Sequence, residues 1–311
     1  MVSNRMSPRR STVPKPPVCK PPPPPKSPPL GGGYLGQHAT MPPWLVPLPP
    51  PPTTPPYTHI TTRNLLYHAY CPRGIEATAA NLYQIKKRLP LFNGRRIVAV
   101  PVAPDLYSPR TIQRFLGPRI EIITIPNDPR LRDSATFHAL LSAIQSTNDT
   151  EATFYAHTKG TSPRYPGHPA DARAIRDWRN AAYHYLLDDW RRVAAALRTY
   201  ATCGTHLIDH SLALDPIMRS PTGLKYGSWH YAGTFFWFRH DHVFRRPEWS
   251  AVPADPWANE MWLGHLLPVT AAKSLYQPWP ATADPAPNPY LAALHPRHFP
   301  DPRGVLSLLR R

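Results

Sequence analysis

The stretch from Phe154 to Gly160 reads Phe-Tyr-Ala-His-Thr-Lys-Gly, an apolar run that stops abruptly on three polar residues and a glycine. This pattern predicts a buried strand that carries functional side chains at its carboxyl end. In open α/β sheets, ligands bind outside the carboxyl ends of the strands, where loops and free backbone groups form a crevice. The alternative is an ordinary exit from a strand into a polar loop.

Strand-like and helix-like segments alternate before this stretch. Short apolar strands are expected at residues 65–69, 96–101, 119–125 and 152–156, and amphipathic helices at 76–89, 108–116 and 133–144. Such alternation is typical of βαβ units, so it predicts an α/β fold with a mostly parallel, doubly wound sheet flanked by helices.

The pattern after the stretch is less regular. We expect a loop at 161–170, a long helix from 171 to about 199, a strand at 205–208, an aromatic strand at 229–239, and helices at 241–245 and 257–267. From residue 271 the chain is again rich in proline and predicts no further element.

Proline divides the chain into three parts. Of its 45 prolines, 20 lie before Tyr57, in a stretch that has no acidic residue. Proline removes backbone donors and favours extended conformations, so this stretch cannot form a packed core. We therefore predict a disordered arm at residues 1–56, a domain at 57–270 and a Pro-rich extension at 271–311. The arm is either a plain linker or a PxxP-type docking segment.

The chain is strongly basic, with a formal net charge of +17. Seven basic residues lie before Asn64, so about +10 belongs to the remainder. This excess favours an anionic ligand, whether nucleotide phosphates, nucleic acid or an acidic membrane surface. A compositional bias toward Arg, Ala and Pro, as in proteins from GC-rich genomes, is the alternative.

The cysteines and the apolar stretches bear on location. The three cysteines, Cys19, Cys71 and Cys203, are widely spaced and support neither a disulfide framework nor a zinc site. No stretch reaches the roughly 18 to 20 apolar residues that span a bilayer, and the N-terminus lacks an apolar signal core. We expect a reduced, cytoplasmic protein, with peripheral membrane association as the alternative.

Four motifs occur in a distinctive order: His157-Thr-Lys-Gly160, Trp178-Arg179, Gly233-Thr-Phe-Phe-Trp-Phe-Arg239, and Glu260 with Trp262. This set resembles a branch of GT-A-type glycosyltransferases, including bacterial and phage proteins, that carries HTKG, WR and GNFWW or GTMFW signatures. The resemblance covers about residues 64–267. It implies a Rossmann-like GT-A fold with a nucleotide-sugar half and an acceptor half, and a role such as polysaccharide biosynthesis.

The resemblance also implies a donor site at the end of the predicted 152–156 strand. Most GT-A enzymes place an Asp-x-Asp there to hold a divalent metal against the diphosphate, whereas this chain has His157-Thr158-Lys159. We therefore expect Lys159 to take the metal's place beside the diphosphate of a UDP-, GDP- or TDP-sugar, with Arg179 or Arg164 assisting. His157 would ligate a metal or hydrogen-bond the phosphate. The alternative is that Lys159 faces solvent.

Further donor-binding residues follow from the same placement. The nucleotide is expected across the carboxyl ends of the first and third predicted strands. The residues within reach lie at those ends or in the stretch that ends at Gly160: His68, Tyr70, Asn127, Asp128, Thr158 and Gly160.

Sugar transfer also needs a base that takes the proton of the acceptor hydroxyl. Glu260 is isolated on an otherwise apolar helix, where inverting GT-A enzymes place their catalytic carboxylate. One alternative is that Glu260 is an ordinary glutamate on the helix surface. Another is that Asp209 or Asp255 is the base. Trp178 lies on the apolar stripe of its helix and is expected in the core rather than at a ligand.

The aromatic strand is expected to line the cleft for sugar and acceptor. Aromatic faces stack on sugar rings, and glycine lets a substrate approach the backbone. The residues concerned are Trp229, His230, Gly233, Thr234 and Trp237, with core packing as the alternative for one face of the strand.

The leading hypothesis is therefore an inverting glycosyltransferase that acts on a glycan or glycolipid. Two alternatives stay open. One is a glycosyltransferase that modifies hydroxymethylated bases in DNA, which the basic charge favours. The other is a non-catalytic module that binds a sugar nucleotide, which the missing Asp-x-Asp favours.

Overall fold

The computed structural model describes residues 58–161, 169–210 and 227–277. The predicted arm and nearly all of the predicted C-terminal extension lie outside these residues, so their boundaries stay predictions. Every feature below belongs to the compact unit that follows residue 46.

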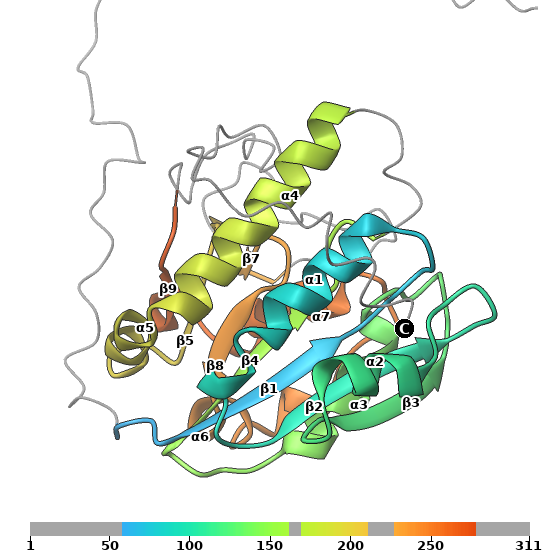
Figure 1. The fold of residues 1–311 in the computed structure, drawn as a ribbon. Helices are drawn as coiled ribbons and strands as arrows, with labels where there is room; N and C mark the ends of the chain where they lie inside the picture. Colours follow the sequence, from blue (N-terminus) through green and yellow to red (C-terminus); the bar gives the residue numbers. More distant parts are fainter. Residues whose placement is uncertain (1–57, 162–168, 211–226, 278–311) are drawn as a thin grey trace, which may run out of the picture. The chain divides into compact units, whose positions relative to one another are not determined.

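A seven-stranded sheet forms the centre of this unit (Figure 1), with its strands in the order β3-β2-β1-β4-β8-β5-β9. The strands are β1 (Thr62–His68), β2 (Arg96–Val102), β3 (Glu121–Pro126), β4 (Glu151–His157), β5 (Thr202–Gly204), β8 (Phe236–Arg239) and β9 (Ala272–Ser274). β8 pairs antiparallel with both neighbours, and every other pairing is parallel. This confirms the predicted α/β, Rossmann-like class with a mostly parallel sheet. A separate ribbon pairs β6 (Leu207–Asp209) with β7 (Trp229–Tyr231).

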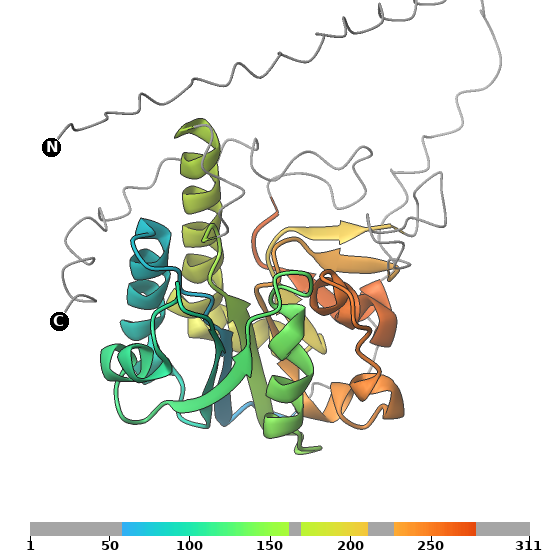
Figure 2. The same ribbon diagram turned by 90° about the vertical axis from the view of Figure 1, so that its right-hand side faces the viewer.

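Helices cover both faces of the sheet, which Figure 2 shows edge-on. One face carries α1 (Glu76–Lys86), α2 (Pro109–Leu116), α4 (Pro169–Tyr183) and α5 (Trp190–Leu197). The other face carries α3 (Ser134–Ile144), α6 (His240–Val243) and α7 (Ala258–Leu266). Short 3₁₀ turns lie at Leu89–Leu91, Pro247–Ser250 and Val269–Ala271.

The central strands are apolar throughout because successive side chains point to opposite faces of the sheet, and both faces are covered. Along β2, Val98 and Val100 point into the core under α1 and α2, whereas Ile97 and Ala99 point into the core under α3. A strand covered on both faces must be apolar at successive positions. Burial on both sides therefore fixes β1, β2 and β4 as the rigid base for the loops at their ends.

Three elements differ from the sequence prediction. The long helix expected to run to residue 199 is interrupted by a π turn at His184–Asp188, and Asp189 caps α5 by accepting from the amide of Arg192. The aromatic segment at 229–239 forms two strands, β7 and β8, because the chain turns at Gly233 and Thr234, both with positive φ. β9 lies in the segment assigned to the C-terminal extension. At three residues it is too short to give a sequence pattern.

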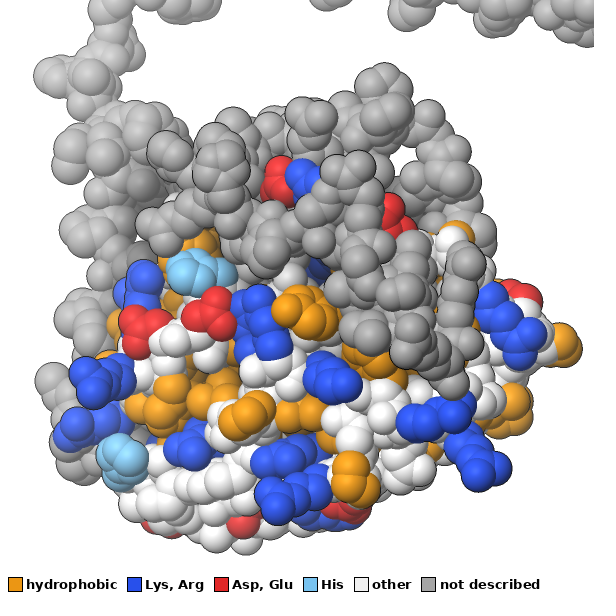
Figure 3. Space-filling model, viewed as in Figure 1, with side chains coloured by type: hydrophobic (Ala, Val, Ile, Leu, Met, Phe, Trp, Pro, Cys, Tyr) orange, Lys and Arg blue, Asp and Glu red, His pale blue; other side chains and the backbone are white. Residues whose placement is uncertain are grey.

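Positive charge is spread over the face that carries α1 and α2 (Figure 3). Its exposed cations include Lys86, Lys87, Arg110, Arg114 and Arg119. Burial and the neighbouring Arg119 lower the pKa of Arg96, as expected where cations crowd together. Within the described residues, no helix is both long and apolar enough to cross a membrane.

Arg239, at the end of β8, joins several segments at the amino-terminal end of β4. Its side chain is fully buried, and it donates hydrogen bonds to the carbonyl oxygens of Thr58 (2.9 Å), Asp149 (2.6 Å) and Leu197 (3.2 Å). Its Nε also donates to Asp241 at 3.0 Å. A guanidinium carries five donors in a planar fork, so a single side chain can satisfy all these acceptors.

We predict that Arg239→Met lowers the free energy of unfolding by about 3–5 kcal/mol, because it leaves Asp241 and three carbonyl groups without their donor. Urea unfolding measures this change. The exposed Arg110→Met is the matched control and should stay within about 0.5 kcal/mol of the parent protein. Equal effects of the two substitutions would show that Arg239 does not join these segments.

Candidate functional site

A pocket lies at the carboxyl ends of β1 and β4, with a cavity volume of about 320 Å³. β1 is the point where the strand order reverses, because β2 and β3 lie on one side of it and β4 on the other. The amide of Thr158 donates to the carbonyl oxygen of His68 at 3.0 Å and so joins the two strand ends. Such a switch point is the usual ligand crevice of an open α/β sheet.

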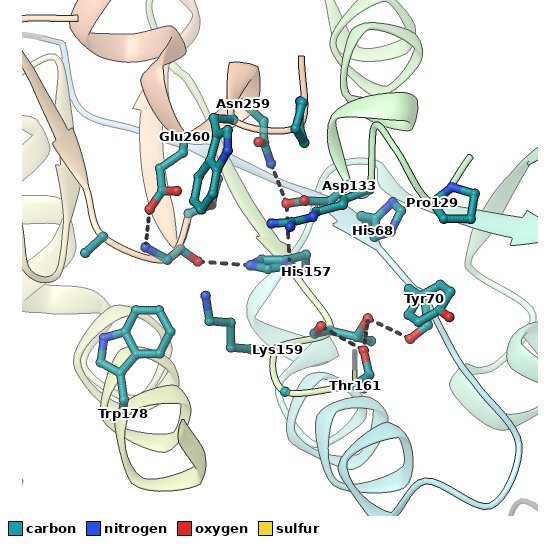
Figure 4. A pocket seen from close by; sticks show the side chains of 18 of the residues that line it. His68, Tyr70, Pro129, Asp133, His157, Lys159, Thr161, Trp178, Asn259 and Glu260 are labelled. Carbon is teal, nitrogen blue, oxygen red and sulfur yellow. Dashed lines mark hydrogen bonds and ion pairs between the residues drawn. The ribbon is translucent and has the colours of Figure 1, made fainter. Parts of the chain in front are cut away.

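The backbone of Gly233 joins the side chains of Glu260 and His157 in this pocket (Figure 4). Its N–H donates to Glu260 Oε1 at 2.8 Å, and its carbonyl oxygen accepts from His157 Nε2 at 3.1 Å. Gly233 has a φ of +85°, and an added Cβ would lie 1.7 Å from the ring of Trp178. The position therefore requires glycine, because any side chain would collide with the indole.

Asp133 lies on the other side of His157. Its Oδ2 is 3.5 Å from His157 Nδ1 and accepts a hydrogen bond from Asn259 Nδ2. Burial alone would raise the pKa of Asp133, but the charges of His157 and His68 and the bond from Asn259 hold it below its usual value. Asp133 therefore stays ionised as a hydrogen-bond acceptor beside the pocket. Burial lowers the pKa of His157 despite the nearby carboxylate.

Lys159 is fixed from its backbone outward. The side chain of Asn81 donates to the carbonyl oxygen of Lys159 at 2.9 Å and accepts from its amide at 3.2 Å. The ammonium group of Lys159 lies 4.3 Å from the centroid of the Trp178 ring, a distance typical of a cation–π interaction. The Trp178 indole donates in turn to His206 Nδ1 at 2.9 Å. The cation is therefore held at one wall of the pocket.

Arg179 follows Trp178 on α4 but does not line the pocket. Its side chain is buried, and its Nε has no hydrogen-bond partner among the described residues. Burial lowers its pKa, because removing a charge from water disfavours the ionised form. It lies one helical turn before Tyr183, whose hydroxyl reaches Asn81 Oδ1 at 3.4 Å. Arg179 is therefore a buried cation whose Nε lacks a partner among the described residues, one helical turn from the tyrosine that reaches Asn81.

The structure brings most of the predicted donor residues together. Those that line the pocket with Lys159 and Glu260 are His68, Tyr70, Asn127, His157, Thr158 and Gly160. Asp128 is not among them, because its carboxylate turns outward to pair with Arg130 at 3.1 Å. The residues predicted at the ends of the first and third strands follow β1 and β3, which are not adjacent because β2 lies between them. The pocket therefore extends beyond the ends of two neighbouring strands. Arg164 lies outside the described residues.

The predicted acceptor residues divide into two groups. Gly233 and Thr234 line the pocket, and His230 lies behind Glu260, 3.9 Å from its Oε1. Trp229 and Trp237 are wrong as cleft residues, because both are fully buried in the two cores. The Trp229 indole donates to the carbonyl oxygen of Leu267, and that of Trp237 donates to the carbonyl oxygen of Leu186.

Other predictions are also corrected. Trp178 was expected only in the core, but it is buried and also forms a pocket wall. Neither Asp209 nor Asp255 lines the pocket. Several lining residues were missed, including Arg132, Asp133, Trp257 and Asn259. Asp133 looked like an ordinary helix start, and the only signal for Asn259 was its position next to Glu260.

In the described part of the chain, no group of three or more His, Cys, Asp or Glu side chains is arranged to hold a metal ion. No protein-family model matches the chain, and no curated protein matches it. Among solved structures, the fold is similar to a crystal structure of 4-diphosphocytidyl-2C-methyl-D-erythritol synthase. That likeness has 12% sequence identity and a TM-score of 0.34, and it covers 82% of this chain and 99% of the other. At these values it carries no argument about function.

We predict that Gly233→Ala destabilises the fold by more than the cost of its positive φ, because the new methyl group collides with Trp178. The matched control is Gly74→Ala, at a φ of +76° with no atom within 4 Å of the added Cβ. Gly74→Ala should cost about 1–2 kcal/mol, the strain of the left-handed conformation. Thermal and urea unfolding measure both, and equal losses would contradict the close approach of Trp178.

Proposed function

We propose that this protein is a glycosyltransferase that moves a sugar from a nucleotide-sugar donor to a hydroxyl group of a glycan or glycolipid. The proposal is carried by one observation, the convergence of four stretches that lie far apart in the sequence. One pocket is lined by all four: the tip after β4 (residues 157–160), Trp178, the turn at Gly233 and Thr234, and Glu260. The same four stretches suggested the family resemblance, and chance motifs would not be expected to converge.

The wall formed by the tip after β4 suits the diphosphate of the donor. Transfer leaves negative charge on the departing nucleoside diphosphate, and fixed positive groups stabilise that charge in the transition state. Lys159 offers an ammonium with a fixed backbone, and Arg132 lines the same pocket. Gly160, with a φ of +79°, lets the chain turn closely around an anion.

Glu260 suits the role of the base. Its side chain is 15% exposed, and the amide of Gly233 fixes Oε1. Burial raises its pKa, while Lys159 and the Gly233 amide oppose the rise. A carboxylate whose pKa is raised by burial is a stronger proton acceptor than an exposed one.

The remaining walls suit a sugar ring. Trp178 and Trp257 both line the pocket, and aromatic faces pack against the apolar faces of sugars. Asp133 and Asn259 form a hydrogen-bonded pair at the same surface. A held carboxylate and amide are the kind of groups that bind sugar or ribose hydroxyls.

We predict that one of the UDP-, GDP- or TDP-sugars binds in isothermal titration and is consumed in a transfer assay. Lys159→Met should weaken donor binding about tenfold to a hundredfold, which corresponds to one lost charged hydrogen bond. Glu260→Gln should bind the donor normally but lower the transfer rate by at least about a hundredfold. The exposed Lys86→Met is the charge-matched control. Failure of all these donors to bind would refute the proposal.

We also predict opposite effects of Arg179→Met on stability and on binding. The substitution removes a charge that burial disfavours and whose Nε lacks a partner among the described residues, so the free energy of unfolding of the unliganded protein should stay the same or rise. Donor affinity should fall, because the cation behind the tip no longer attracts the diphosphate. Arg88→Met is the contrasting control, since Arg88 is also buried but pairs with Asp188 at 2.6 Å and should destabilise when removed. A destabilised Arg179→Met protein would show that the charge has a structural partner.

A further inference from the structure

Three residues other than glycine have a positive φ in the part of the chain that the structure describes, and all three lie at the pocket. They are Arg132 (+55°), His206 (+57°) and Thr234 (+63°). Arg132 and Thr234 line the pocket, and His206 accepts a hydrogen bond from the indole of Trp178, which forms one wall. Backbone strain of this kind clusters at active and ligand-binding sites. The three residues are therefore candidates for substrate contact or for its support.

Thr234 is the most unusual of the three. Its side chain is branched at Cβ, and a β-branched residue at positive φ is an outlier, whereas glycine and asparagine adopt this conformation readily. The turn itself does not need threonine. Its backbone hydrogen bond, from the amide of Thr234 to the carbonyl oxygen of Tyr231 at 3.2 Å, would form equally well with glycine. The side chain of Thr234 must therefore contribute something that offsets the strain.

The hydroxyl of Thr234 has no evident structural use. The residue is 4% exposed and lines the pocket, and its hydroxyl forms no hydrogen bond to another described residue. A threonine that served only for packing would be expected to bond its hydroxyl to the protein, because burying a hydroxyl without a partner is costly. The partner of this hydroxyl is therefore expected in the pocket.

The position of Thr234 is tied to that of Glu260. The amide of Gly233, the preceding residue, donates to Glu260 Oε1 at 2.8 Å. One turn therefore places the side chain of Thr234 and the carboxylate of Glu260 at the same end of the pocket. An ionised carboxylate only accepts hydrogen bonds, whereas a threonine hydroxyl both donates and accepts. Thr234 is therefore suited to a hydroxyl group of the substrate that lies beside the one facing Glu260.

We propose that the Thr234 hydroxyl binds a second hydroxyl group of the acceptor, next to the one that Glu260 deprotonates. This inference rests on the proposed function, in which Glu260 is the base. It names the class of acceptor as a sugar ring with vicinal hydroxyl groups, because a single turn can then hold both groups of one diol. An acceptor with one isolated hydroxyl, such as a hydroxymethylated base, would leave Thr234 without a partner.

Three substitutions separate the hydroxyl of Thr234 from its shape. Thr234→Val keeps the shape and should lower kcat/KM for transfer to the methyl glycosides of glucose, galactose or mannose about threefold to tenfold, the loss of one neutral hydrogen bond. Thr234→Ser keeps the hydroxyl and should retain the parent kcat/KM. Thr234→Gly relieves the strain, so it should lower kcat/KM without lowering the urea midpoint of unfolding. The exposed Thr61→Val is the matched control and should behave as the parent.

Deoxy acceptors identify the partner of the hydroxyl. For the best of the three glycosides, an analogue without the hydroxyl next to the reacting one should lose as much kcat/KM in the parent as Thr234→Val loses with the intact glycoside. In Thr234→Val the same analogue should lose nothing more, because the two groups form one hydrogen bond.

Two results would overturn the inference and leave the proposed function standing. One is a Thr234→Val enzyme with the parent kcat/KM, or with a loss that adds to the loss from every deoxy analogue. The other is transfer to the single hydroxyl of 5-hydroxymethyldeoxycytidine in place of the glycosides. If the parent neither binds nor consumes any of the nucleotide-sugar donors, the proposed function fails, and the inference fails with it.

Discussion

The pocket depends on the backbone of Gly233. The N–H of Gly233 donates to Glu260 and its carbonyl oxygen accepts from His157, while the Trp178 ring covers the place of a side chain. Four segments, from β4, α4, the turn before β8 and α7, thus meet at a residue with no side chain. Pre-organised polar groups of this kind lose little entropy when a ligand binds.

The sheet explains why these segments meet. β1 and β4 are buried on both faces, so their ends are rigid, and the chain leaves each of them at the switch point. Asn81 on α1 then bonds both backbone groups of Lys159, which joins the first helix to the tip after β4. Arg179, one helical turn before the tyrosine that also reaches Asn81, is a buried cation, and burying its charge has a cost in stability. Such costs are commonly tolerated near functional sites.

Much of the fold was predictable, because its signals are local. Apolar strands, helix starts such as Ser108-Pro109 and the abrupt change at His157 are read within a few residues. The partners of Asp133 were not predictable, since Asn259 lies 126 residues away and nothing near either residue indicates the pair. Trp229 and Trp237 were misassigned because a run of aromatic residues gives no sign of which face is buried. The turn at Gly233 separates β7, which lies beside the pocket, from β8, which lies inside the sheet.

The central claim is that one pocket at the ends of β1 and β4 binds the nucleoside diphosphate of a donor. Hydrogen–deuterium exchange, with and without the best-binding diphosphate among UDP, GDP and TDP, tests its location most directly. The account predicts slower exchange in peptides that cover residues 127–133, 157–161, 232–234 and 257–260, and unchanged exchange in α2 and β9. Protection confined to the basic face around α1 and α2, or no protection with any of the three nucleotides, would contradict it.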